Sequence, residues 1–130
     1  MVRMRCKVSA LLGKTLNNIE VNNVNGGDEI IFFCQDGAKY RMYHEQDCSE
    51  SVFIEDICGS LPALIGKPLT MAEDVSNKCG RPAKDPWVYS CTWTWYKFAT
   101  VTGYVTIRWY GESNGYYSEG VDFEIMEDKE

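Results

Sequence analysis

Two segments of this chain, far apart in the sequence, carry the same patterns of residues in the same order. The pattern Arg-x-Tyr-x-Glu-x-Asp/Asn occurs at 41–47 and again at 108–114. The pattern Ser-Glu-x-Val-x-Ile/Phe-Glu follows at 49–55 and again at 118–124. A duplicated sequence constrains the fold strongly, because each copy must form a similar structural unit and the two units must then pack together.

A third match marks where each copy begins. Leu-Leu-Gly-Lys-Thr-Leu at 11–16 is similar to Leu-Ile-Gly-Lys-Pro-Leu at 64–69. Three matches in register predict an internal duplication of about 11–57 and 64–126. A polar insertion at 76–90, which has no counterpart in the first copy, is expected to form a loop.

Short runs of β-branched and aromatic residues between glycine turns predict strands. The expected strands are 17–21, 30–34, 39–44 and 50–57 in the first copy, and one near Glu73 followed by 92–98, 104–110 and 119–125 in the second. The unbroken apolar run 30–34 is typical of a strand covered on both faces. Asp36-Gly37 predicts a type I′ hairpin, and Thr102-Gly103 takes the same place in the second copy.

Each copy therefore reads as a four-stranded antiparallel meander. The sequence predicts a mainly β fold, all-β or β-rich α+β, in which two pseudo-repeated meanders pack as a sandwich or close as a barrel. At most a short helix is expected, within the loop 58–65. The two meanders would bury their apolar faces against each other across an approximate two-fold axis.

Size and charge limit the kinds of partner. The 130 residues, 1–130, suit a single domain, and the formal net charge is −6. Electrostatic binding to nucleic acid is therefore not expected, whereas a basic protein partner is. No apolar run has the length of a signal peptide or a membrane span. We expect a cytoplasmic protein whose six cysteines are mostly reduced.

In each copy the arginine, tyrosine and glutamate of the first pattern fall on one face of a strand, and apolar residues fall on the other. The apolar face must point to the core, so the polar set lies outside or in a cleft. This set is either a cross-strand ladder that stabilises the sheet or a recognition surface. Its candidate binding residues are Arg41, Tyr43, Glu45, Arg108, Tyr110 and Glu112.

The loop after the second copy of that pattern is the most attractive binding element. Asn114, Tyr116 and Tyr117 lie on a glycine-containing loop. Tyrosine offers apolar area with a polar tip at a low entropy cost, as binding surfaces often do. Trp87, Tyr89, Trp93 and Trp95 add to the supply of aromatic residues, but most of them are expected to belong to the core.

The single histidine suggests another kind of site. His44 and Cys48 have a separation seen in some zinc sites, and Asp47, Glu50, Cys79 or Cys91 could complete the four ligands. A Cys48–His44 nucleophilic pair is also chemically conceivable. The simpler alternative is a strand-end imidazole that is hydrogen-bonded to a loop carboxylate. Zinc is the only cofactor suggested, and only in that alternative; otherwise we predict no cofactor, no catalytic residue and no enzymatic activity.

Three motifs resemble a family of small, uncharacterised proteins associated with bacteriophages and prophages. They are Tyr-His-Glu-Gln-Asp-Cys at 43–48, Thr-Trp-Thr-Trp-Tyr-Lys-Phe at 92–98, and Arg-Trp-Tyr-Gly-Glu-Ser-Asn-Gly-Tyr-Tyr-Ser-Glu-Gly-Val at 108–121. The resemblance runs from about residue 11 to residue 125. It implies a phage protein in the cytoplasm of a bacterial host, without an established activity. In that family a second cysteine often follows the position of Cys48, where this chain has Ser49.

These observations lead to one main hypothesis and two alternatives. The main hypothesis is a non-enzymatic binding protein, phage-encoded, that inhibits a host protein such as a CRISPR-type anti-phage defence protein. The first alternative is a protein that sequesters a small ligand such as a nucleotide between the copies, with Arg41 and Arg108 on its phosphates. The second is a metal-dependent hydrolase with its site around His44. The oligomeric state is left open.

Overall fold

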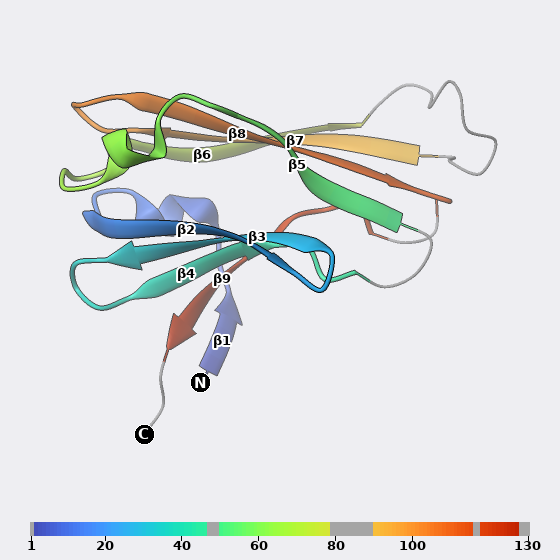
Figure 1. Ribbon diagram of the computed structural model, residues 1–130, viewed down its shortest axis with the longest axis horizontal. Coiled ribbons are helices and arrows are strands. Elements are labelled where there is room, and N and C mark those ends of the chain that lie inside the picture. Colours follow the sequence, from blue (N-terminus) through green and yellow to red (C-terminus); the bar gives the residue numbers. More distant parts are fainter. Residues whose placement is uncertain (1, 47–49, 79–89, 116–117, 128–130) are drawn as a thin grey trace.

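The computed structural model describes residues 2–46, 50–78, 90–115 and 118–127. Among these residues, nine strands form two antiparallel sheets that pack face to face (Figure 1). The five-stranded sheet has the order β1-β9-β4-β3-β2, and the four-stranded sheet has the order β5-β8-β7-β6. The prediction of a mainly β sandwich is confirmed. The sheets do not close into a barrel.

The strands and two short 3-10 helices have the following bounds: β1 Val2–Arg5, η1 Val8–Leu11, β2 Leu16–Val24, β3 Gly27–Cys34, β4 Lys39–Tyr43, β5 Glu50–Cys58, η2 Leu61–Leu64, β6 Met71–Lys78, β7 Ser90–Ala99, β8 Tyr104–Ser113 and β9 Asp122–Glu127. The helix η2 is the short helical turn expected between the copies, and η1 holds the equivalent place before β2. In the described part of the chain, no helix has the length and apolar character needed to cross a membrane.

The fourth strand of each copy leaves its own meander. β2, β3 and β4 pair in sequence, but β5 crosses to the other sheet and pairs with β8. β6, β7 and β8 also pair in sequence, and β9 crosses back to pair with β4. The prediction of two separate four-stranded meanders is therefore wrong. An alternating pattern specifies which face of a strand is buried, but it does not choose between two similar strands as the pairing partner.

Corresponding residues of the two copies make reciprocal contacts. The N–H of Gly13 donates to the carbonyl of Leu69 at 2.8 Å, and the N–H of Gly66 donates to the carbonyl of Leu16 at 2.9 Å. Both glycines have a positive φ, 82° and 92°, which a residue with a Cβ adopts only at a cost. Both leucines are buried. These bonds tie the start of β2 to the segment that leads into β6.

The core lies between the two sheets, where their inner faces meet. The rings of Phe32 on β3 and Phe98 on β7 have centroids 5.4 Å apart. The indole N–H of Trp109 on β8 points at the sulfur of Met42 on β4, 3.2 Å away. The largest fully buried side chains are Trp109, Phe32, Phe98, Leu11, Leu16, Ile30, Met42, Leu64, Leu69, Ile107 and Val105. The apolar faces predicted for β4 and β8 thus point inward.

One turn and one strand end differ from the sequence predictions. The turn with two residues of positive φ is Asn25-Gly26, at 53° and 81°, so the two-residue type I′ hairpin lies there. At Asp36-Gly37 a hairpin forms, but only Gly37 has a positive φ, so that turn is not type I′. β6 extends through 76–78, which were expected in the insertion, because β7 continues to pair with it. Residues 79–89 lie outside the described residues.

The apolar run 30–34 is covered on one face only. Ile30, Phe32 and Cys34 are buried, whereas Ile31 and Phe33 are partly exposed on the outer face of the five-stranded sheet. Among the cysteines that the structure describes, Cys6, Cys34 and Cys58 are free thiols and Cys91 is disulfide-bonded.

Candidate functional site

Aromatic side chains form a continuous cluster on the outer face of the four-stranded sheet. Trp93 and Trp95 project from β7 with ring centroids 6.2 Å apart. Trp93 packs on Tyr110 of β8 at 4.7 Å, and Tyr110 packs on Phe53 of β5 at 5.8 Å. Phe53 is 39% exposed, and the other three rings are partly exposed. We call these four residues the aromatic face.

The alternation of β7 explains why its tryptophans point outward. Thr94, Tyr96 and Phe98 are buried between the sheets, so the residues between them must lie on the opposite face. The prediction that most of the four residues Trp87, Tyr89, Trp93 and Trp95 belong to the core is therefore wrong; Trp87 and Tyr89 lie outside the described residues. The sequence did hold the necessary signal, because Lys97 shares their face and lysine is almost never fully buried without a partner.

Charged groups border the aromatic face. Arg108 pairs with Glu55, and its guanidinium group lies 5.4 Å from the centroid of the Trp93 ring. The hydroxyl of Tyr110 donates to the carboxylate of Glu112 at 3.0 Å. Burial, followed by this hydrogen bond, raises the pKa of Tyr110, so the phenol stays a donor at neutral pH. The predicted residues Arg108, Tyr110 and Glu112 thus lie together at this face.

The corresponding residues of the first copy form a compact ion-pair network instead. Arg41 on the outer face of the five-stranded sheet pairs with both Glu29 and Glu124. The side chains are only 17%, 10% and 6% exposed. The guanidinium group also lies 3.7 Å from the centroid of the Tyr43 ring. These contacts have the form of a cross-strand ladder, in which the arginine pairs with carboxylates and a tyrosine ring packs on it. Glu45 lies just beyond the end of β4 and is exposed.

The two arginines do not face a common ligand. Met42 and Trp109, their neighbours in β4 and β8, are buried between the sheets, so Arg41 and Arg108 lie on opposite outer faces of the sandwich. Each is also engaged in its own ion pairs. This geometry does not support the hypothesis of a nucleotide held between the two guanidinium groups.

His44 is a buried residue with a partner at each ring nitrogen. Nδ1 lies 2.7 Å from the carbonyl oxygen of Gly120, and Nε2 lies 3.2 Å from a carboxylate oxygen of Glu50. A carbonyl oxygen only accepts, so Nδ1 carries a proton. A metal ion at His44 would have to displace one of these partners. Within the described residues, no group of three or more His, Cys, Asp and Glu side chains could hold a metal ion.

The glutamate equivalent to Glu50 in the second copy is also a buried anchor. Glu119 accepts hydrogen bonds from the hydroxyls of Thr92 at 2.7 Å and Ser113 at 2.5 Å. It thereby attaches the segment before β9 to the ends of β7 and β8. Of the remaining predicted residues, Asn114 is exposed just after β8, whereas Asp47, Cys48, Tyr116 and Tyr117 lie outside the described residues.

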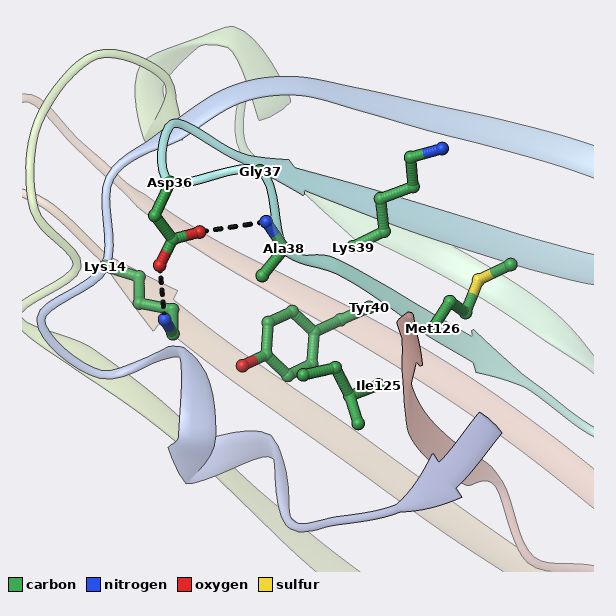
Figure 2. A pocket seen from close by; sticks show the side chains of 8 residues that line it. All are labelled: Lys14, Asp36, Gly37, Ala38, Lys39, Tyr40, Ile125 and Met126. Carbon is green, nitrogen blue, oxygen red and sulfur yellow. Dashed lines mark hydrogen bonds and ion pairs between the residues drawn. The ribbon is translucent and has the colours of Figure 1, made fainter. Parts of the chain in front are cut away.

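A polar pocket of about 550 Å³ lies beside the β3–β4 hairpin. Figure 2 shows the Tyr40 ring next to Ile125, with Lys14 and Asp36 nearer the turn. The ammonium group of Lys14 lies 2.7 Å from the Asp36 carboxylate, which also accepts from the N–H of Ala38. Because the carboxylate neutralises this lysine and caps the turn, we assign the pocket a structural role.

Comparison with known proteins gives a family but no activity. The model of a domain of unknown function, DUF7448, matches residues 9–123. The chain belongs to the DUF7448 family. Neither a curated protein nor a solved structure matches it. The match covers all of the four-stranded sheet of this DUF7448 domain, the aromatic face included, and β2, β3 and β4 of the other sheet.

Proposed function

We propose that this DUF7448 domain is a non-enzymatic binding protein that holds another protein against its aromatic face. The observation that supports this most directly is the cluster of four partly exposed rings with Val75, which is 46% exposed, next to it on β6. Contiguous apolar area of this kind usually marks an interaction site. Tryptophan, tyrosine and arginine are also the residue types that contribute most to the energy of protein interfaces.

The arrangement of the rings favours a protein over a sugar or a nucleic acid. Their centroids are 4.7 to 6.2 Å apart and the ring planes are inclined by 23° to 62°. The rings therefore pack against one another and do not offer separate parallel platforms for successive bases or sugars to stack on. A net charge of −6 also opposes binding to a polyanion. Protein side chains can interdigitate with such a cluster.

The surrounding charges suit a basic partner. Glu55, Glu112 and the exposed Glu73 of β6 border the aromatic face, and the whole chain is acidic. Opposite charges on a partner would speed association and orient it. In the phage setting that the sequence resemblance implies, this partner would be a host protein, and blocking a defence protein is the corresponding role.

The single histidine supports a binding role more than a catalytic one. His44 is 7% exposed, and both of its ring nitrogens have partners inside the protein. A general base must reach the proton that it removes from a substrate. His44 instead fastens the end of β4 to the segment before β9.

The test compares two surface variants for capture of proteins from a lysate of phage-sensitive bacteria. One carries Trp93→Ser and Trp95→Ser. The matched control carries Ile31→Ser and Phe33→Ser, on the outer face of the other sheet. We expect at least one protein to be captured by the wild-type chain and by the control, and to be recovered at least tenfold less with the tryptophan variant.

Circular dichroism and thermal unfolding verify that both variants are folded. Capture that is insensitive to the tryptophan pair would contradict the proposed function. Equal losses of captured protein in both variants would contradict it as well. Such a result would mean that any removal of apolar residues from the surface weakens capture, whichever sheet carries them.

A further inference from the structure

The two sheets end in four edge strands, and within the described part of the chain β6 has the most regular edge, although η1 packs against this strand. β1 is only four residues long. β2 and β5 each contain a shift of register in their pairing. Short strands and bulges are common ways in which proteins keep an edge from pairing with another chain. β6, in contrast, has eight residues and pairs with β7 in one uninterrupted register.

The side chains of β6 leave this edge open to solvent. All six residues from Glu73 to Lys78 are exposed, and the strand contains neither proline nor glycine. An edge strand presents unpaired N–H and C=O groups along its free side. An extended peptide can pair with these groups by adding to the sheet as a further strand.

The side chains of an added strand would meet two different surroundings, because they alternate between the faces of the sheet. On the outer side, Val75 lies opposite Trp95 and next to the aromatic face. On the inner side, a pocket of about 250 Å³ borders β6 at Asp74, and Tyr96 and Val8 also line it. The outer positions suit apolar side chains. The inner position suits a side chain with an apolar stem and a basic head that reaches the Asp74 carboxylate.

Charge distinguishes a foreign segment from a second copy of this chain. Glu73 and Asp74 are adjacent on the exposed part of β6. In a parallel in-register pair of β6 strands, or in an antiparallel pair centred on these two residues, both carboxylates would lie opposite their counterparts, and like charges across strands destabilise the pairing. A lysine- or arginine-containing segment would instead be attracted.

We propose that the free edge of β6 binds an extended, basic segment of the partner protein, which adds to the four-stranded sheet as a fifth strand. This inference rests on the proposed function, since the added strand continues the sheet that carries the aromatic face. Apolar side chains of the segment would lie beside Val75, and a lysine or arginine between them would approach Asp74.

The test uses a displayed library of random eight-residue peptides as the probe, selected on the full-length protein. We expect the enriched peptides to alternate apolar residues with lysine or arginine. Added as synthetic peptides to the ¹⁵N-labelled protein, they should slow hydrogen exchange of amides in residues 73–78 at least tenfold. Amides of β1, β2 and β5 should not change.

Four variants separate backbone pairing from simple charge attraction. Glu73→Lys combined with Asp74→Lys should weaken binding of the selected peptides at least tenfold. Glu20→Lys, on the exposed β2 edge, is the matched control and should change it less than threefold. Val75→Pro and Ser76→Pro each remove one backbone N–H group. Because successive N–H groups of a strand point to opposite edges, one of the two removed groups pairs with β7 and the other points to the free edge of β6. The variant that keeps the wild-type melting temperature should lose peptide binding.

Each other outcome overturns the inference. These outcomes are a library that enriches no peptide, peptides that protect another edge, binding that survives both proline variants, and protection of β6 in a concentration-dependent dimer without peptide. The two proposals can also fail separately. If the tryptophan variant loses the captured protein but the folded proline variant does not, only the inference fails. If peptides protect β6 while the tryptophan variant keeps its partner, only the proposed function fails.

Discussion

The guanidinium group of Arg41 on β4 lies 3.5 Å from the carboxylate of Glu124 on β9, although the two residues belong to different copies of the duplicated sequence. Arg108 on β8 pairs with Glu55 on β5 in the same way. Glu55 and Glu124 are the last residues of the two copies of one pattern. Each arginine therefore binds the glutamate of the other copy, and these ion pairs form because the fourth strands exchange between the sheets.

The two equivalent arginines are expected to differ in their contribution to stability. Arg41→Ala leaves the nearly buried Glu29 and Glu124 without this cation and should cost about 3–5 kcal/mol of unfolding free energy. Arg108 and Glu55 are 38% and 36% exposed, so Arg108→Ala should cost at most about 1 kcal/mol. Urea unfolding at pH 7 measures both. Similar losses in the two variants would contradict this assignment.

Gly111 should not tolerate a side chain. A Cβ there would lie 2.6 Å from the carbonyl oxygen of Glu119 and 3.1 Å from a methyl carbon of Val52. Because a backbone oxygen cannot move aside cheaply, Gly111→Ala should destabilise the fold by about 1–3 kcal/mol. Gly120→Ala is the control, since its Cβ would meet only the Ser118 hydroxyl at an ordinary 3.5 Å. Thermal unfolding of both variants tests this. If Gly111→Ala kept the wild-type melting temperature, the segment before β9 would not be held in place against Gly111.

His44 is expected to act in stability and not in metal binding. His44→Ala removes the donor to the Gly120 carbonyl and the contact with Glu50, which should cost about 1–3 kcal/mol because both groups are buried. Glu45→Ala, at the exposed neighbouring position, should change stability by no more than about 0.5 kcal/mol. Equimolar zinc should leave the wild-type melting temperature unchanged. A zinc-dependent rise that disappears in His44→Ala would restore the metal hypothesis.

The free cysteines should react at very different rates. Burial raises the pKa of Cys34 to about 11, so at pH 8 only about one molecule in a thousand carries the reactive thiolate there. Cys58 is exposed. Iodoacetamide at pH 8, followed by peptide mass spectrometry, should label Cys58 at least a hundredfold faster than Cys34. Because the raised pKa lies above the pH used, the Cys34 rate should increase about tenfold per pH unit toward 11. Equal labelling rates of Cys34 and Cys58 at pH 8 would mean that the end of β3 at Cys34 opens readily to solvent.

Much of the candidate site could be predicted from strand alternation alone. Arg108, Tyr110 and Glu112 were correctly expected on one outer face, because their apolar neighbours had to point to the core. Trp93 and Trp95 were not recognised, because tryptophan is generally well buried. Lys97 lies on the same face of β7, and a lysine on that face indicates that it is exposed. This indication should have been given more weight than the general burial of tryptophan. The role of β6 could not be predicted, because a strand lies at an edge when no other strand pairs with one of its two sides, and the sequence of the strand does not show this.

The sequence by itself determined the β class, the three matched motifs and the side of most strands that faces the core. These depend on a two-residue period and on local turns, which short-range sterics and hydrophobicity decide. Only the tertiary structure decided that β5 and β9 exchange sheets, that Arg41 is enclosed while Arg108 borders an aromatic surface, and that β6 is left at an edge. Pairing between distant strands depends on how all the strands close around one core, and the alternation within one strand carries no information about which partner that closure selects.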